Sequence, residues 1–92
     1  MKKRSKLVIV MDILAFIESE GGETLATRIA TATGLAYDRM IRLLEELEKK
    51  NIVNIVSGER SKKVVLTEKG VHLLKTLREL RDLIKDLGLE IY

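Results

Sequence analysis

Hydrophobic residues recur along the first part of the chain at the period of an α-helix. Val10, Ile13, Leu14 and Ile17 are three or four positions apart, which is the spacing of one buried stripe on a helix. We expect this helix to span about residues 5–20, because Ser5 can cap its first turn and a glycine pair follows Glu20. Other apolar residues lie around the same helix, so it must pack against two surfaces at once.

Two further helices are predicted on either side of a tight turn at Gly34. A short helix spans about Leu25 to Thr33 with Thr24 as its cap, and a longer one spans about Tyr37 to Lys50 and ends at Asn51. Glycine tolerates positive φ, so Gly34 can reverse the chain between them. The core stripe of the longer helix consists of Met40, Leu43, Leu44 and Leu47.

The period then changes to that of strands, and afterwards returns to that of a helix. Residues 52–56 and 64–66 are rich in β-branched side chains and flank the polar, glycine-containing segment 57–61, which predicts a β-hairpin. Thr67 caps a final helix that begins at Glu68, and Gly88 can end it.

The apolar positions of this final helix follow alternating steps of four and three residues, as in a heptad seam. They are Leu73, Leu77, Leu80, Ile84, Leu87 and Ile91. Leu74 and Leu83 widen the seam. A domain this small cannot cover so wide a stripe, so we expect the seam to be a dimer interface between two copies of the chain. The alternative is a helix folded back on its own domain.

Composition narrows the class of protein. The 92 residues are 46% hydrophobic and 34% charged, which is typical of one globular domain. The chain has no Cys and one His, so disulfides and thiolate metal sites are excluded, and we expect no metal and no cofactor. Asp12 interrupts the apolar run at 7–17, which is too short to span a membrane. We therefore expect a cytoplasmic protein with no membrane partner.

Charge is distributed unevenly along the sequence. The net charge is +3, and its positive excess lies in residues 1–6 and in the hairpin turn at 57–63. Residues 12–24, in contrast, are acidic. Clustered basic residues suit a polyanionic partner such as nucleic acid.

The predicted order of elements is helix, helix, tight turn, helix, β-hairpin, helix, which is that of a winged helix-turn-helix. Helix-turn-helix units have a small residue where the two helices cross, which is Ala30 here. A turn glycine follows four positions later, at Gly34, and an apolar residue that anchors the next helix follows six positions after that, at Met40. We therefore expect a mainly α fold with a β-hairpin (α+β). Residues 1–67 would form the winged helix-turn-helix and residues 68–92 the dimerisation helix of the same domain.

The sequence also resembles a known family. The resemblance lies in residues 27–30, 34–37, 43–47 and the Leu-Thr-Glu-Lys-Gly stretch at 66–70. These stretches resemble the small archaeal winged-helix proteins associated with chromatin, and the wider group of MarR-like regulators. The resemblance covers nearly the whole chain. It implies a dimer whose C-terminal helices form an antiparallel coiled coil, and a nucleoid-associated location. The acidic segment 12–24 and the charge-neutral third helix depart from the chromatin proteins.

In this fold the third helix would enter the major groove of double-stranded DNA. Opposite the core stripe lie Asp38, Arg42, Glu45 and Lys49, with Arg39 on one flank. The N-terminal half of such a helix meets the bases, so the candidate groove contacts are Tyr37, Asp38, Arg39 and Arg42. For Tyr37 the alternative is a partly buried packing residue. The competing interpretation is that Asp38–Arg42 and Glu45–Lys49 are ion pairs that support any exposed helix.

The hairpin would act as a wing on the DNA backbone or minor groove. Its candidate contacts are Arg60, Lys62 and Lys63, and further candidates for backbone contacts are Thr27, Arg28, Lys3 and Arg4. Basic hairpin tips and chain ends are also common as plain solvated segments.

Catalysis has no support, because the chain contains no P-loop, no nucleophile elbow and no zinc-protease motif. The expected function is therefore that of a dimeric DNA-binding protein, either a transcriptional regulator or a chromatin factor, and not an enzyme. The alternative is a protein–protein interaction module, which the neutral third helix and its acids Glu45, Glu46 and Glu48 favour. A small-molecule effector is compatible with the sequence but has no support in it.

Overall fold

The computed structural model describes residues 4–89, which form four helices and one three-stranded antiparallel sheet. In chain order the elements are α1 (Lys6–Ser19), β1 (Glu23–Leu25), α2 (Ala26–Thr33), α3 (Tyr37–Lys49), β2 (Val53–Ser57), β3 (Lys62–Leu66) and α4 (Glu68–Asp86). The mainly helical α+β prediction is confirmed, and so is the order of every predicted element. The strand β1 is an addition that the sequence pattern did not predict.

Local signals in the sequence set most of the helix ends. The Ser5 hydroxyl accepts from the Val8 N–H at 3.2 Å and begins α1, and the Thr67 hydroxyl accepts from the Gly70 N–H at 3.0 Å and begins α4. Gly34 follows α2 with φ of 72°, and Asn51 follows α3 with φ of 62°. Gly88, at φ of 77°, lies just beyond α4. These caps and turns agree with the predicted boundaries.

The assignment of Thr24 as the cap of α2 is wrong. Thr24 lies in β1, opposite Val64 of β3, and its hydroxyl donates to Glu20 Oε1 at 3.1 Å. The residue that precedes α2 is Leu25, which makes no side-chain cap. The sheet order is β1-β3-β2, so β3 lies in the centre and the β2–β3 hairpin joins the body of the domain through it.

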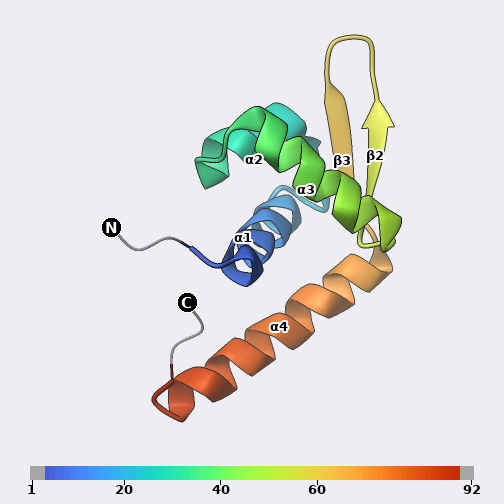
Figure 1. The fold of residues 1–92 in the computed structure, drawn as a ribbon. Coiled ribbons are helices and arrows are strands. Elements are labelled where there is room, and N and C mark those ends of the chain that lie inside the picture. The colour runs from blue at the N-terminus through green and yellow to red at the C-terminus, as the bar shows by residue number, and fades with distance from the viewer. Residues whose placement is uncertain (1–3, 90–92) are drawn as a thin grey trace.

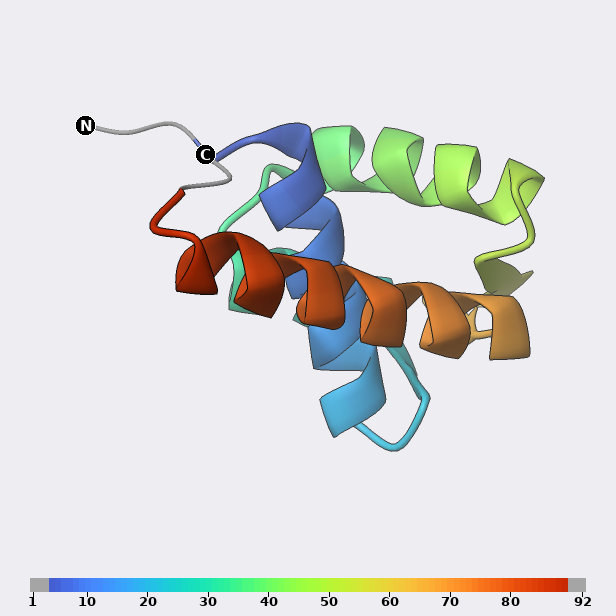
Figure 2. The ribbon, with the colours of Figure 1, turned by 90° about the horizontal axis from the view of Figure 1, so that it is seen from below.

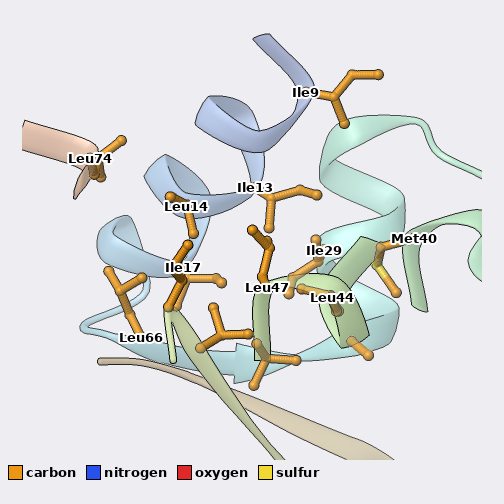
Figure 3. Packing of buried hydrophobic residues seen from close by; sticks show 14 residues of the cluster. Ile9, Ile13, Leu14, Ile17, Ile29, Met40, Leu44, Leu47, Leu66 and Leu74 are labelled. Carbon is orange, nitrogen blue, oxygen red and sulfur yellow. The ribbon is translucent and has the colours of Figure 1, made fainter. Parts of the chain in front are cut away.

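The core surrounds α1, which packs against α2, β3 and α4. Figure 3 shows how Ile13, Leu14 and Ile17 of α1 lie among side chains of α2, α3 and the sheet. From α3, Met40 and Leu44 are fully buried, whereas Leu43 is only partly buried against this cluster. The remaining buried hydrophobic residues are Ile9, Met11, Ala26, Ile29, Leu47, Ile52, Val53, Val64, Leu66 and Leu74.

The burial of Leu74 corrects one detail of the predicted seam. Leu74 is 1% exposed and belongs to the core of its own domain, so it does not widen the exposed stripe of α4. It fastens the first half of α4 to α1, and the ion pair between Arg78 and Glu18 at 2.7 Å reinforces the contact. Beyond this point α4 extends away from the core, and its later leucines are therefore exposed.

The elements are arranged so that two surfaces lie on opposite sides of the domain. In Figure 1 the β2–β3 hairpin extends past α2 and α3, while α4 runs across the other side of α1. Figure 2, seen from below, shows α4 crossing α1 on that side. In residues 4–89, none of the helices has the length and apolar character needed to cross a membrane.

Candidate nucleic-acid interface

The outward side of α3 presents the residues predicted to contact a DNA groove. Met40, Leu44 and Leu47 fix the buried side of the helix. The structure places Tyr37, Asp38, Arg39 and Arg42 on its exposed side, within its first two turns. Asp38 also lies in the first turn, where a carboxylate interacts favourably with the helix dipole. The sequence period therefore predicted which way this helix faces.

The cations on α3 do not form the ion pairs that the sequence offered as an alternative. Within the described residues, Arg42 is not within ion-pair distance of Asp38, nor Lys49 of Glu45. Arg39 has no ion-pair partner there either. The guanidinium groups of Arg39 and Arg42 are thus directed to solvent, and both are available to an external anion.

The hairpin carries a second group of basic side chains at and near its turn. The N–H of Gly58 donates to the carbonyl of Ser61 at 2.8 Å and closes the turn, which leaves Arg60 exposed at the tip. Lys62, the first residue of β3, is partly buried, and its neighbour Lys63 lies 3.4 Å from Glu23 of β1. Arg60 and Lys62 make no ion pair within residues 4–89.

This combination of helices, turn and hairpin agrees with the comparison with known families. A profile described as winged helix-turn-helix matches residues 3–85. The chain belongs to the winged helix-turn-helix family. In the terms of this family α3 is the recognition helix and the β2–β3 hairpin, residues 53–66, is the wing.

Solved structures share the winged-helix fold of this chain. Sso10a-2, a DNA-binding protein from Sulfolobus solfataricus, is 27% identical, with a TM-score of 0.81 over 92% of this chain and 86% of that chain. F93 from STIV, a winged-helix DNA-binding protein, is 18% identical, with a TM-score of 0.75 over 84% of this chain and 90% of that one.

A transcriptional regulator of the MarR family from Rhodococcus sp. RHA1 is 21% identical, with a TM-score of 0.79 over 91% of this chain and 61% of that one. The resemblance to archaeal winged-helix proteins and to MarR-like regulators is confirmed by these similarities. A search among curated proteins gave no match.

Several cations predicted to contact DNA form ion pairs inside the winged-helix domain. Arg4 donates to Asp12 at 2.6 Å and to the carbonyl of Thr33 at 2.6 Å, so it links α1 to the end of α2. Arg28 donates to Glu20 at 2.6 Å, again between α1 and α2. Lys3 lies outside the described residues. Thr27 is exposed on α2, and its carbonyl accepts from the Thr31 hydroxyl.

The acidic segment 12–24 is neutralised by these and similar contacts. Each of its four carboxylates has a cation within ion-pair distance: Asp12 with Arg4, Glu18 with Arg78, Glu20 with Arg28 and Glu23 with Lys63. The hydrogen bond from Arg28 is the largest cause that lowers the pKa of Glu20 below its ordinary value. The segment therefore presents far less negative charge than its sequence suggests.

Two of the three glutamates in the second half of the recognition helix also have partners within the domain. Lys6 contacts Glu46 at 2.8 Å, and this hydrogen bond is the main cause that lowers the pKa of Glu46. Glu48 accepts from the backbone N–H of Ile55 in the wing at 2.8 Å. Sequence reasoning missed both contacts, because neither partner can be inferred from a local pattern. The ion pair with Lys6 offsets the charge of Glu46, and the hydrogen bond from Ile55 occupies the carboxylate of Glu48 without neutralising it.

The last helix presents an apolar face on the opposite side of the domain from the wing. Leu80, Leu83 and Leu87 are 45%, 55% and 65% exposed. Of the other predicted interface residues, Leu73, Leu77 and Ile84 are partly buried, and Leu73 packs against the core. Ile91 lies outside the described residues. The exposed apolar face thus begins after Arg78, the residue of α4 that pairs with Glu18 of α1.

Metal-binding side chains do not gather in the described part of the chain. Residues 4–89 contain no cluster of three or more His, Cys, Asp or Glu side chains able to hold a metal ion. His72 is exposed near the start of α4.

Proposed function

We propose that this winged-helix chain is a dimeric protein that binds double-stranded DNA, with its recognition helix in the major groove. The wing would contact the backbone or the minor groove. The observation that supports this function most strongly is that both predicted contact elements carry cations without ion pairs. Arg39 and Arg42 of the recognition helix, and Arg60 and Lys62 of the wing, have no ion-pair partner within residues 4–89. Arg4 and Arg28, in contrast, are neutralised within the domain.

The relatives support the same function. Sso10a-2 and F93 are both described as DNA-binding proteins, and both match this chain over most of its length. An arginine can donate twice to a guanine in the major groove, and each such pair contributes about 1–3 kcal/mol of discrimination. Arg39 and Arg42 are the arginines of α3, and we assign them this role. Tyr37 and Asp38 would contact the same groove, and Thr27 the adjacent backbone.

The partner proposed for α4 is a second copy of the chain. Three exposed leucines on one helix form an apolar surface that water solvates poorly, and a heptad seam is the pattern by which two such helices pack. The family resemblance implies an antiparallel pair. Because α4 lies across the domain from the wing, this dimer would leave both DNA faces open (Figure 1).

Within DNA-binding proteins, the charge of the recognition helix favours a selective regulator over a protein that coats DNA regardless of sequence. Asp38 and Glu45 are exposed beside the two arginines and have no ion-pair partner within the described residues. Carboxylates so close to phosphate oppose binding by charge alone, so binding must depend on base contacts. The proposed protein is non-enzymatic and acts in the cytoplasm, on the nucleoid.

A binding assay with paired variants tests this function. Fluorescence anisotropy on a labelled duplex, over a series of salt concentrations, would compare Arg39→Ala/Arg42→Ala with Arg60→Ala/Lys62→Ala. The control is Lys75→Ala/Lys85→Ala, which removes two exposed cations of α4 instead. We expect both test pairs to weaken binding. The slope of affinity against salt should fall by about one for each phosphate that the variant no longer neutralises.

The recognition-helix pair should also lose preference for duplexes selected from random DNA, because it removes base contacts. The control pair should bind like the wild type. If the control pair and both test pairs bind equally, the proposed DNA face is wrong.

A further inference from the structure

We propose that Glu48 is a positioning residue of the DNA face, which holds the wing at a fixed angle to the recognition helix. This role rests on the proposed function in DNA binding. Glu48 lies in the last turns of α3, and its Oε2 accepts from the backbone N–H of Ile55 at 2.8 Å. Ile55 is the central residue of β2, so the contact joins the recognition helix to the middle of the first strand of the wing.

The Ile55 N–H is available because it lies on the open edge of the sheet. β2 has β3 on one side only. Val53 of β2 is opposite Leu66 of β3, whose N–H donates away from β2, to Gly22. In antiparallel strands the direction of backbone groups alternates with each residue. Ile55, two residues after Val53, therefore also directs its N–H away from β3, and Glu48 satisfies it.

No other side-chain hydrogen bond or ion pair joins the recognition helix to the wing within residues 4–89. The wing continues beyond Ile55 to the cations of the hairpin tip, and each residue of a strand adds about 3.3 Å. A rotation of about 10° at Ile55 therefore moves the hairpin tip at Arg60 by roughly 2 Å. A carboxylate hydrogen bond is short and strong enough to limit such a rotation.

Glu45 provides a matched control on the same helix. It is one turn earlier than Glu48, exposed, and has no ion-pair or hydrogen-bond partner within the described residues. Replacing either glutamate by alanine removes one negative charge from the second half of α3. By charge alone, both replacements should strengthen binding to phosphate.

The two alanine variants are therefore expected to act in opposite directions. Glu45→Ala should raise duplex affinity by up to about twofold, because it removes a negative charge and no contact to the wing. Glu48→Ala should lower duplex affinity by about fivefold, because it removes one net hydrogen bond that orders the wing. Glu48→Gln keeps an acceptor oxygen and should bind at least as tightly as the wild type. Glu48→Asp keeps the charge but is one methylene too short, and should bind like Glu48→Ala.

A double-mutant comparison separates a positioning role of Glu48 from a general effect on stability, because it measures whether the effect of Glu48→Ala on duplex affinity depends on the wing cations. In an Arg60→Ala/Lys62→Ala background, Glu48→Ala should cause no further loss, because the wing contacts that it orders are already absent. Amide hydrogen exchange at Ile55 should be faster in Glu48→Ala and unchanged in Glu45→Ala, with or without DNA. Circular dichroism at the assay temperature would verify folding, and Glu48→Asp serves if Glu48→Ala does not fold.

The outcomes distinguish this proposal from the function on which it rests. A wild-type protein that binds no duplex overturns the proposed function and, with it, the role of Glu48 in DNA binding. A protein that binds duplex, but in which Glu48→Ala binds as tightly as Glu45→Ala, overturns the role of Glu48 alone. An equal loss from Glu48→Ala with and without the wing cations overturns it too.

Discussion

Arg28 Nε donates to Glu20 Oε1 at 2.6 Å, so the cation at the start of α2 is neutralised by the end of α1. Because the pair cancels its own charge, we expect Glu20→Gln/Arg28→Ala, which removes both charges together, to change duplex affinity by less than about twofold. Arg42→Ala removes an unpaired cation from the recognition helix, and we expect a loss of about tenfold or more. Anisotropy titrations at one fixed salt concentration measure both. Equal losses would place Arg28 on the DNA.

The same ion pair predicts how stability changes with pH. The pKa of Glu20 is lowered in the folded chain, first by the hydrogen bond from Arg28 and then also by that from Thr24. A lowered carboxylate pKa contributes stability above the unfolded value of about 4.3, and this stability is lost as the pH falls through the lower folded value. We expect the melting temperature of Glu20→Gln to fall less steeply than that of the wild type between about pH 5 and pH 3.

Thermal melts followed by circular dichroism at several pH values give this comparison. Glu45→Gln is the control, since Glu45 has no ion pair within residues 4–89. It should follow the wild-type curve. If Glu20→Gln follows that curve as well, the Arg28 contact contributes nothing to acid stability.

The sequence predicted those parts of the fold that local signals determine. Ser5, Gly34 and Thr67 each mark a helix end through a cap or a turn that involves only nearby residues. The strand β1 could not be predicted in this way, because three residues show no period. β1 exists only through its pairing with β3, in which Glu23 lies opposite Val65.

For the candidate site, too, the sequence predicted the features that depend on local pattern and missed those that depend on tertiary contacts. The period of the core stripe was enough to direct Arg39 and Arg42 outward. The pairing of Arg4 and Arg28 depends instead on how α1 and α2 cross, and no pattern within either helix contains that angle. The contact between Glu48 and Ile55 likewise requires the position of β2 beside α3. Sequence period therefore predicts which residues face outward, and tertiary structure decides which of them form internal contacts.

The two faces of α4 should respond differently to mutation. Leu80 and Leu87 are exposed, so Leu80→Asp/Leu87→Asp should give a folded monomer, because charges are introduced only into the proposed dimer seam. Leu74→Ala should instead lower the free energy of unfolding by about 2–5 kcal/mol, because it leaves a cavity in the core.

Analytical ultracentrifugation and thermal melts of the same samples test this pair of expectations. Lys75→Asp is the control, since about 3.6 residues per turn places it on the side of α4 away from Leu80. It should sediment like the wild type. If Leu80→Asp/Leu87→Asp also sediments like the wild type, the dimer seam lies elsewhere.

Gly70 allows the start of α4 to approach the turn that follows the recognition helix. The Thr67 hydroxyl donates toward the carbonyls of Asn51 and Ile52, at 2.6 and 2.9 Å. A Cβ at Gly70 would overlap the Ile52 carbonyl oxygen and come within 2.6 Å of Leu66 Cδ1. In most helices Gly→Ala stabilises by about 1 kcal/mol. Here we expect Gly70→Ala to destabilise the fold by about 1–3 kcal/mol, because a backbone atom must move.

Urea unfolding of Gly70→Ala and of Lys69→Ala, at the exposed neighbouring position, measures this effect. Lys69→Ala should stay close to the wild-type midpoint, and Gly70→Ala should unfold at lower urea with the same slope. Because this turn links α3 to both β2 and α4, the destabilisation should also accelerate amide exchange at Ile52 and Val53. A Gly70→Ala protein as stable as the wild type would mean that α4 can move away from Ile52 without cost, and that its close approach does not fix the position of the recognition helix.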